Sequence, residues 1–231
     1  MRLRVKFRKY GPVRFIGHLD VMRYFQKAIR RAEIDVAYSS GFSPHQIMSF
    51  ASPLSVGLES NGEYMDFEVN SLTSCQDIRN RLNAVSAPGI EVTSVIELPD
   101  TAGNAMASVA AASYTVRFRE GREPKLDITT VLPDFLAKEQ ILYTKETKKG
   151  TREIDLKAGI YELTWQDNQF FMLVDASSAG NIKPVQIIEA LLAEHGEVLQ
   201  ENALLVTRED TFTNIGTENK PNLVPLDAVG K

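Results

Sequence analysis

Cationic side chains recur at helical spacing near the N-terminus. Arg23, Lys27 and Arg30 stand four and three residues apart, and Arg31 extends the same stripe. Residues at this spacing share one face of a helix. A stripe of cations can follow a phosphate backbone, because each neutralised phosphate releases a condensed counterion. The spacing therefore indicates a surface for an anionic partner, and a merely solvated helix face is the alternative interpretation.

Two histidines and two carboxylates form a second group of candidates. His18 and Asp20 stand at the start of the basic helix, His45 follows in a Gly- and Ser-rich loop, and Glu63 opens a later strand. Two imidazoles and a carboxylate can ligate a metal ion. No fixed spacing ties these residues together, and Asp20 also suits the first-turn amides of a helix. We expect hydrogen-bonding or structural roles and no metal, with an enzyme that uses all four residues as the alternative.

A third candidate lies in the second half of the chain, where the loop 177–184 leads into a predicted helix. Backbone amides at a helix start can hold an anion, and Lys183 adds a positive charge there. The loop matches no phosphate-binding pattern, so an ordinary helix entry is the alternative.

The net charge of −4 hides a strong asymmetry between the two ends of the chain. Residues 1–31 hold ten Lys and Arg against one acid, a charge of +9, whereas the other 200 residues carry −13. This imbalance indicates an anionic partner for the N-terminal end, or cations that are neutralised inside the fold. For the first strand we expect the second outcome, with Arg4 or Lys6 paired to Asp66 or Glu68 on the exposed face of a sheet.

The composition narrows the class of protein. Of the 231 residues 43% are hydrophobic and 24% are charged, as in a globular protein. A single cysteine, Cys75, excludes a disulfide framework within the chain. No stretch reaches the ~18 apolar residues of a membrane span, and the N-terminus lacks the apolar core of a signal peptide. We expect a cytoplasmic protein that does not bind membranes.

Periodicity predicts the elements that must position these residues. Residues 2–8 and 63–69 alternate between apolar and polar side chains as half-buried strands do, and residues 19–32 show the apolar spacing of a helix. Further strands are predicted at 35–39, near 47–50 and at 91–98, with a second helix from 75 to 87. The resulting order is βαββαβ, the ferredoxin-like pattern.

The second half of the chain shows the same pattern at an offset of 111 residues. Val5 and Phe7 match Val116 and Phe118, a predicted helix falls at 186–197, and a predicted strand falls at 203–206. Other strands are predicted at 141–146, 153–157, 160–165 and 170–174, with a hairpin turn at 166–169. We therefore predict an α+β fold, a tandem duplication of a ferredoxin-like βαββαβ unit. Its parts are a domain at 1–98, a linker at 99–113, a domain at 114–213 and a poorly ordered tail at 214–231.

Several runs of residues are specific enough to suggest a family. They are Arg14-Phe-Ile-Gly-His-Leu-Asp-Val-Met-Arg23, Tyr38-Ser-Ser-Gly-Phe-Ser-Pro-His45, Ser49-Phe-Ala-Ser-Pro-Leu54, Gly57, Glu59-Ser60, Gly62-Glu-Tyr64, Arg152-Glu-Ile-Asp155 and Gly180-Asn-Ile-Lys-Pro184. The chain resembles a bacterial family of unknown function that is described as radical-SAM-associated. Gln46 and Ile47 depart from its pattern, because the family usually reads Pro-His-Pro followed by a cation.

This resemblance implies a radical SAM protein as partner, because members of the family occur beside such a protein or fused to it. A radical SAM enzyme holds its iron–sulfur cluster through several cysteine thiolates, so a chain with one cysteine is not that enzyme. We predict a non-catalytic accessory protein, without a cofactor of its own, that binds RNA or another anionic substrate. A protein-only scaffold is a further alternative. The predicted contact residues are Arg14, His18, Arg23, Lys27, Arg30, Ser43, His45 and Lys183.

Overall fold

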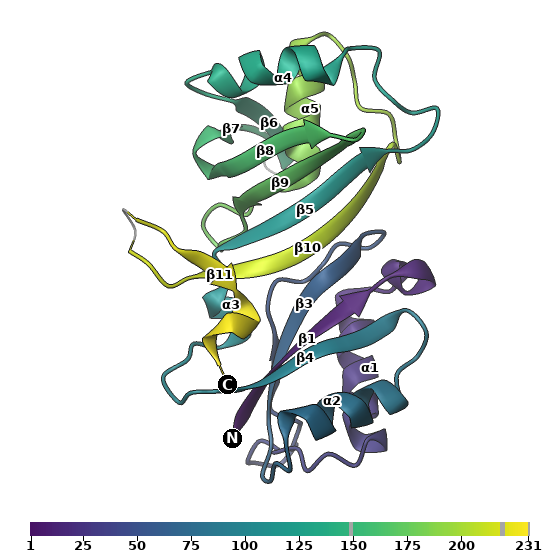
Figure 1. The fold of residues 1–231 in the computed structure, drawn as a ribbon, viewed down its shortest axis with the longest axis vertical. Helices are drawn as coiled ribbons and strands as arrows, with labels where there is room; N and C mark the ends of the chain where they lie inside the picture. The colour runs from purple at the N-terminus through teal and green to yellow at the C-terminus, as the bar shows by residue number, and fades with distance from the viewer. Residues whose placement is uncertain (148–149, 218–219, 231) are drawn as a thin grey trace. The chain divides into compact units, whose positions relative to one another are not determined.

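A computed structural model describes residues 1–147, 150–217 and 220–230 (Figure 1). The described residues form a mixed α/β fold with a large mixed β-sheet and five α-helices. The chain divides into two compact units, Met1–Ala110 together with Arg208–Lys231, and Ala111–Thr207.

The sheet of the first unit is built around β1 (Arg2–Lys9), which pairs antiparallel with β3 (Glu59–Glu68) on one side and with β4 (Ile90–Leu98) on the other. A short strand, β2 (Met48–Phe50), pairs with β3. Successive side chains of a strand point to opposite faces. The alternation predicted from the sequence is confirmed, because Leu3, Val5 and Phe7 are all fully buried.

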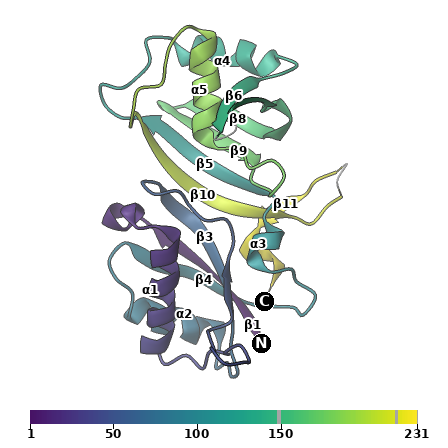
Figure 2. The same cartoon turned by 180° about the vertical axis from the view of Figure 1, so that it is seen from behind.

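Helices α1 (His18–Arg31) and α2 (Cys75–Ala84) cover this buried face of the sheet. Figure 2 shows α1 lying across the strands of the first unit. Val21, Phe25 and Ile29 of α1 and Ile78 and Leu82 of α2 join the core formed with the strands. The opposite side of α1 therefore faces solvent, and the cationic stripe lies on that side.

In the second unit, β9 (Gln169–Asp175) lies between β5 (Ala111–Phe118) and β8 (Ile160–Gln166) in the sheet. The predicted hairpin turn at 166–169 is confirmed, since Asp167 and Asn168 both adopt positive φ angles, of 51° and 58°. Its other elements are α4 (Ile128–Ala137), the hairpin of β6 (Leu142–Thr147) and β7 (Gly150–Asp155), α5 (Pro184–Glu194), and the first residues of β10 (Leu204–Asn214).

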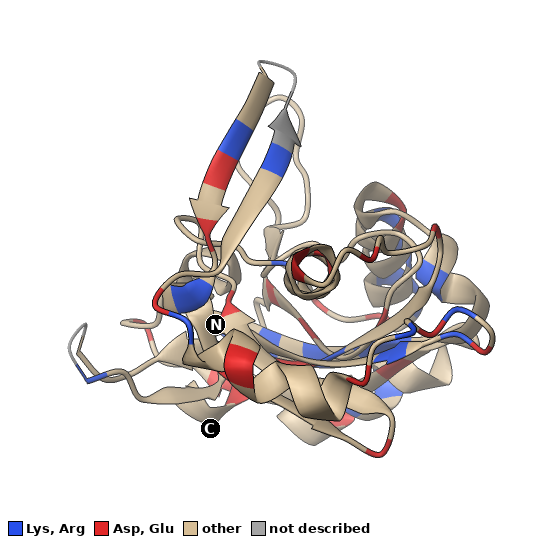
Figure 3. Cartoon of the chain, turned by 90° about the horizontal axis from the view of Figure 1, so that it is seen from above, with Lys and Arg blue, Asp and Glu red and all other residues tan. Residues whose placement is uncertain are grey.

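The hairpin β6–β7 projects from the second unit and carries both signs of charge (Figure 3). Lys145 lies opposite Arg152, and Glu153 is the next residue of the same strand. Both faces of this hairpin are exposed along β7. The hairpin therefore presents both signs of charge and not a purely cationic surface.

Elements of the second unit begin close to the positions given by the offset of 111 residues. β5, α5 and β10 start within three residues of the positions that the offset gives for β1, α2 and β4. The tandem duplication of a ferredoxin-like unit nevertheless stays a prediction.

Two regions differ from the predicted elements. Residues 35–39 make only two isolated bridges, Val36 with Val69 and Tyr38 with Gln46, because the chain turns away at Gly41 before a ladder can form. Helix α4 was not predicted, since Pro133 lies inside it and removes a helical hydrogen bond. The helix forms because Asp127 caps its first turn and its apolar side chains are buried.

The predicted linker and tail also contain regular structure. Within 99–113, residues Ala105–Ser108 form the short helix α3, and β5 already begins at Ala111. Beyond Asn214, residues Leu223–Pro225 form β11, which pairs with β10, and Leu226–Val229 form a 3-10 helix whose Leu226 is fully buried. This segment is packed because its apolar side chains complete the first unit.

Candidate nucleic-acid interface

The cations of β1 are neutralised within the first unit. Arg4 donates to both carboxylate oxygens of Asp66, at 2.8 and 2.9 Å, as the predicted cross-strand pairing requires. The predicted exposure of this face was wrong, because both side chains are almost completely buried. Arg4 also donates to the carbonyl oxygens of Leu226 and Gly103, so the C-terminal segment and the loop before α3 cover this face.

The neighbouring cations of β1 also have acidic or carbonyl partners. Lys6 lies 2.6 Å from Asp210, and Arg8 lies 3.2 Å from Glu91. Lys9 is buried and donates to the carbonyl oxygen of Ile16 at 3.0 Å. The strand therefore offers little unpaired charge to a ligand.

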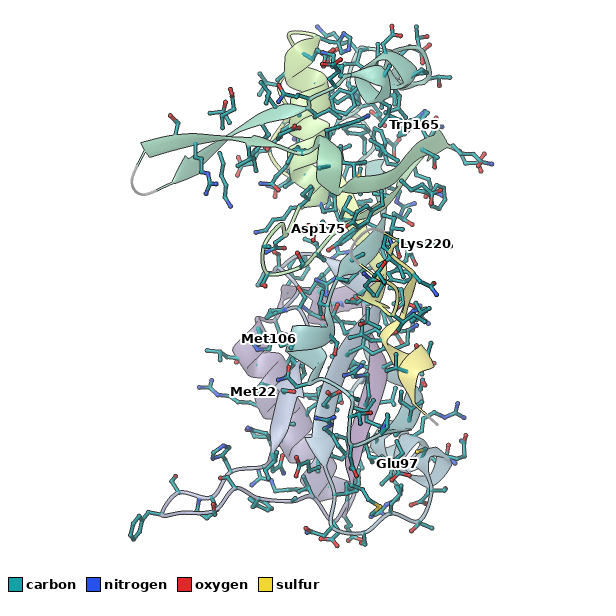
Figure 4. All side chains as sticks on the ribbon, turned by 90° about the vertical axis from the view of Figure 1, so that its left-hand side faces the viewer. Met22, Glu97, Met106, Trp165, Asp175 and Lys220 are labelled. Atoms are coloured by element: carbon teal, nitrogen blue, oxygen red, sulfur yellow. The ribbon has the colours of Figure 1, made fainter. Side chains whose placement is uncertain are left out.

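The cations of α1 remain in solvent. Arg23, Lys27, Arg30 and Arg31 are all exposed. Met22, labelled in Figure 4, marks the helix one residue before this stripe begins. Arg23 makes a loose ion pair with Asp20, at 3.7 Å, and Arg31 donates to a backbone carbonyl. Among the residues that the structure describes, Lys27 and Arg30 have no ion-pair partner.

Arg14 has a structural role at the base of α1. Its guanidinium lies 3.1 Å from Glu59, and the same carboxylate oxygen accepts from the amide of Gly11 at 3.0 Å. The Arg14 carbonyl accepts from the amide of Gly57 at 2.8 Å. Arg14 therefore ties the turn before α1 to the loop before β3, and much of its charge is already neutralised.

A small polar cavity lies beside the first turn of α1. Its lining includes Lys9, His18 and Glu63, together with Phe50 from β2. Its volume is about 10 Å³, the space of a single water molecule at most. His18 meets the Phe50 ring edge-on, with 5.3 Å between ring centroids. The cavity is too small for a substrate, so His18 is better explained as a packing residue.

Glu63, which lines this cavity, belongs to a buried ion pair. Glu63 accepts from Arg208 at 2.9 Å, and Arg208 also donates to the carbonyl of Ser52 at 2.8 Å. Burial lowers the pKa of Lys9, while the nearby Glu63 carboxylate acts in the opposite direction. Sequence analysis did not identify Lys9 or Arg208, because no spacing connects residues that are so far apart along the chain.

His45 does not join this group. It lies in a loop whose Gln46 side chain donates to the Gln26 carbonyl at 3.2 Å. Gln26 is eight residues beyond His18, about 12 Å along the helix axis. The loop therefore contacts α1 about two turns beyond His18, and no three His, Cys, Asp or Glu side chains in the described part of the chain could hold a metal ion.

The loop 39–45 is clamped at its base and open at its tip. Ser39 and His45 exchange backbone and side-chain hydrogen bonds, at 2.8 to 3.1 Å. Ser43, a predicted contact residue, is exposed, and its carbonyl oxygen lies 3.4 Å from the His45 ring. At the tip, the ring of Phe42 is completely exposed. Its position next to a glycine was visible in the sequence, but spacing alone did not reveal its exposure.

Lys183 belongs to the second unit, directly before α5. Its side chain is exposed, but its backbone amide donates to the Gln186 side chain at 2.9 Å. One of the amides that an anion would need is therefore already occupied.

Comparison with known families places the chain among bacterial proteins. The model of a family described as "Uncharacterized protein conserved in bacteria (DUF2344)" matches residues 2–184. The chain belongs to the DUF2344 family. The matched range of this DUF2344 protein contains all of α1, the loop 39–45 and the small cavity, and it stops at the first residue of α5. No curated protein matches the chain.

The family description of this DUF2344 protein names neither a substrate nor a radical SAM partner. Within the described residues, no helix is both long enough and apolar enough to cross a membrane.

Proposed function

We propose that this protein binds RNA through the exposed cationic stripe of α1, defined as Arg23, Lys27, Arg30 and Arg31, and serves as a non-catalytic accessory protein of a radical SAM enzyme. The observation that carries the RNA-binding part is the contrast between two neighbouring elements. Cations of β1 meet Asp66, Asp210 and Glu91, whereas Lys27 and Arg30 of α1 meet no acid among the described residues.

The spacing of the stripe favours a polyanion over a small anion. Arg23 and Arg30 are seven residues apart, about 10 Å along the helix axis. One small anion cannot bridge this distance, whereas successive phosphates of a nucleic acid can. The opposite face of α1 is anchored in the core by Phe25 and Ile29, so the stripe is held on a fixed element.

The proposal of a radical SAM partner rests on the sequence resemblance and on the lack of enough cysteines in this chain to hold an iron–sulfur cluster. The sequence has a single cysteine, whereas an iron–sulfur cluster needs several thiolates. Burial raises the pKa of Cys75, which makes its thiolate less available at neutral pH. A protein that presents RNA to a cluster-containing enzyme is consistent with these properties.

The test is RNA affinity as a function of salt concentration. For the Lys27→Gln/Arg30→Gln double variant we expect weaker binding of single-stranded RNA and a log–log salt slope that is shallower by about 1.4, because two contacts are lost at about 0.7 each. The thermal midpoint should stay the same, since both side chains face solvent. Arg117→Gln/Lys125→Gln is the matched control, because it removes the same charge from exposed positions of the second unit.

Equal affinity and equal salt slope for the wild type and the α1 variant would exclude this RNA site and favour the protein-only scaffold. The partner is tested separately, by isolating the tagged protein from its native cell and identifying bound proteins and RNA together. A partner without a cysteine-ligated iron–sulfur cluster would contradict the radical SAM assignment.

A further inference from the structure

The loop 39–45, whose base contacts α1 through Gln46, presents an aromatic ring to solvent. The relative exposure of Phe42 is 111%, so the ring packs against nothing in the first unit. Gly41, at φ +110°, turns the chain at the tip, and a substitution there would be strained. The ring therefore contributes nothing to the core, although it stands on an ordered loop.

The base of this loop is fixed to α1. Tyr38 and Gln46 form a bridge, and Ser39 and His45 close the loop just inside it. The Gln46 side chain is buried and donates to the carbonyl of Gln26. These contacts tie the base of the loop to α1, and the tip with Phe42 lies beyond them.

The contact at Gln26 also places the base of the loop near two cations of α1. Arg23 and Arg30 are three residues before and four residues after Gln26, and residues at these separations are neighbours on a helix surface. The segment 36–58 contains no Asp or Glu, so it does not repel phosphates. An exposed ring on a loop whose base contacts a cationic helix is a combination with which proteins bind single strands, by stacking bases and contacting phosphates.

We propose that Phe42 is a stacking platform for an unpaired base of the RNA bound at α1, an inference that rests on the proposed function and narrows its ligand to single-stranded RNA. A duplex keeps its bases stacked on each other and offers no free face to the ring. Tyr38 and His45, both exposed at the base of the loop, are placed to extend the platform to a neighbouring base.

The experiment compares a single-stranded oligouridylate with an RNA duplex of equal length, using the full-length protein and fluorescence anisotropy. Phe42→Ala should weaken single-strand binding by between about 5-fold and about 150-fold, the range of one base–aromatic stack, and leave duplex binding unchanged. Phe42→Leu should behave like Phe42→Ala, because it keeps an apolar side chain without a flat ring. Phe42→Trp should bind the single strand at least as well as the wild type.

Phe171→Ala is the control, because it removes a partly exposed phenylalanine from the second unit. The inference is overturned if Phe42→Ala leaves single-strand affinity within twofold, if it weakens both RNAs equally, or if Phe42→Leu binds like the wild type. The last result would indicate an apolar anchor for a partner protein.

The Lys27→Gln/Arg30→Gln variant separates this failure from a failure of the proposed function. If that variant binds both RNAs less tightly while Phe42→Ala changes nothing, only the stacking inference is wrong. If the charge variant changes neither affinity, the RNA site itself is wrong.

Discussion

Replacing Asp66 with Asn tests whether the cations of β1 are neutralised by ion pairs within the fold. Asp66 lies opposite Arg4 in the β1–β3 register, and both side chains are buried, with 3% and 1% of their surface exposed. Removing one partner of a buried ion pair costs about 3–5 kcal/mol, because it leaves the other charge uncompensated. Arg4 keeps two carbonyl acceptors, Leu226 and Gly103, so we expect a loss of free energy of unfolding near the lower end, about 3 kcal/mol.

The measurement is urea denaturation followed by circular dichroism, with the slope of the transition compared between variants. Glu91→Gln is the internal control, because Glu91 of β4 pairs at 3.2 Å with Arg8, another cation of β1, but both side chains are about half exposed. Such a surface pair contributes at most about 1 kcal/mol. The two variants should therefore differ by about 2 kcal/mol or more, although each removes the carboxylate partner of one β1 cation.

A loss below about 1 kcal/mol for Asp66→Asn would refute this reasoning. It would mean that Arg4 finds water or another acceptor once Asp66 is neutral, so the sheet face opens easily. The strand would then return as a candidate anion-binding surface, and the contrast between β1 and α1 would no longer support the proposed function. RNA affinity of Asp66→Asn, measured below its unfolding temperature, should be that of the wild type.

Two further predictions concern the small cavity and the histidines. Burial lowers the pKa of Lys9 from its ordinary value of 10.5, so between the two values the unfolded chain binds more protons and the free energy of unfolding rises with pH. Lys9→Met should remove this rise. If the free energies of unfolding of the two proteins, measured by denaturation at pH 8 to 10, change equally with pH, the shift is contradicted. Purified, dialysed protein should carry no stoichiometric metal by mass spectrometry. His45→Ala should leave the metal content unchanged, because the His45 ring is hydrogen-bonded to Ser39. Stoichiometric zinc that is lost with His45 would restore the enzyme alternative.

Periodicity predicted the local elements of the first unit well. The predicted helix 19–32 is α1, His18–Arg31, because its apolar side chains recur at the spacing that one face of a helix requires. β1 and β3 followed from alternation for the same kind of reason. The prediction of a strand at residues 35–39 was wrong, because a strand needs a partner over several residues. Spacing within one segment cannot show that such a partner is missing.

Long-range contacts were beyond the reach of the sequence. Lys6 pairs with Asp210, more than two hundred residues away, and Arg4 bonds to the carbonyl of Leu226 in the segment predicted to be a tail. Alternation showed which side chains share a face of the sheet, but not that a C-terminal segment returns to cover it. For this reason the pairing of Arg4 with Asp66 was predicted correctly while its exposure was not.

The same distinction decides how a charge-rich segment should be interpreted. A basic N-terminus suggests an anionic ligand, but most of its strand cations are matched by acids that the fold brings from β3, β4 and β10. On α1 such matching is limited, because the helix buries one face and turns the other to water. Among the residues that the structure describes, the one ion pair of the stripe is the loose contact of Arg23 with Asp20. The positive charge that is left unpaired, on α1, is what a ligand would meet, and it is smaller and more localised than the charge of +9 suggested.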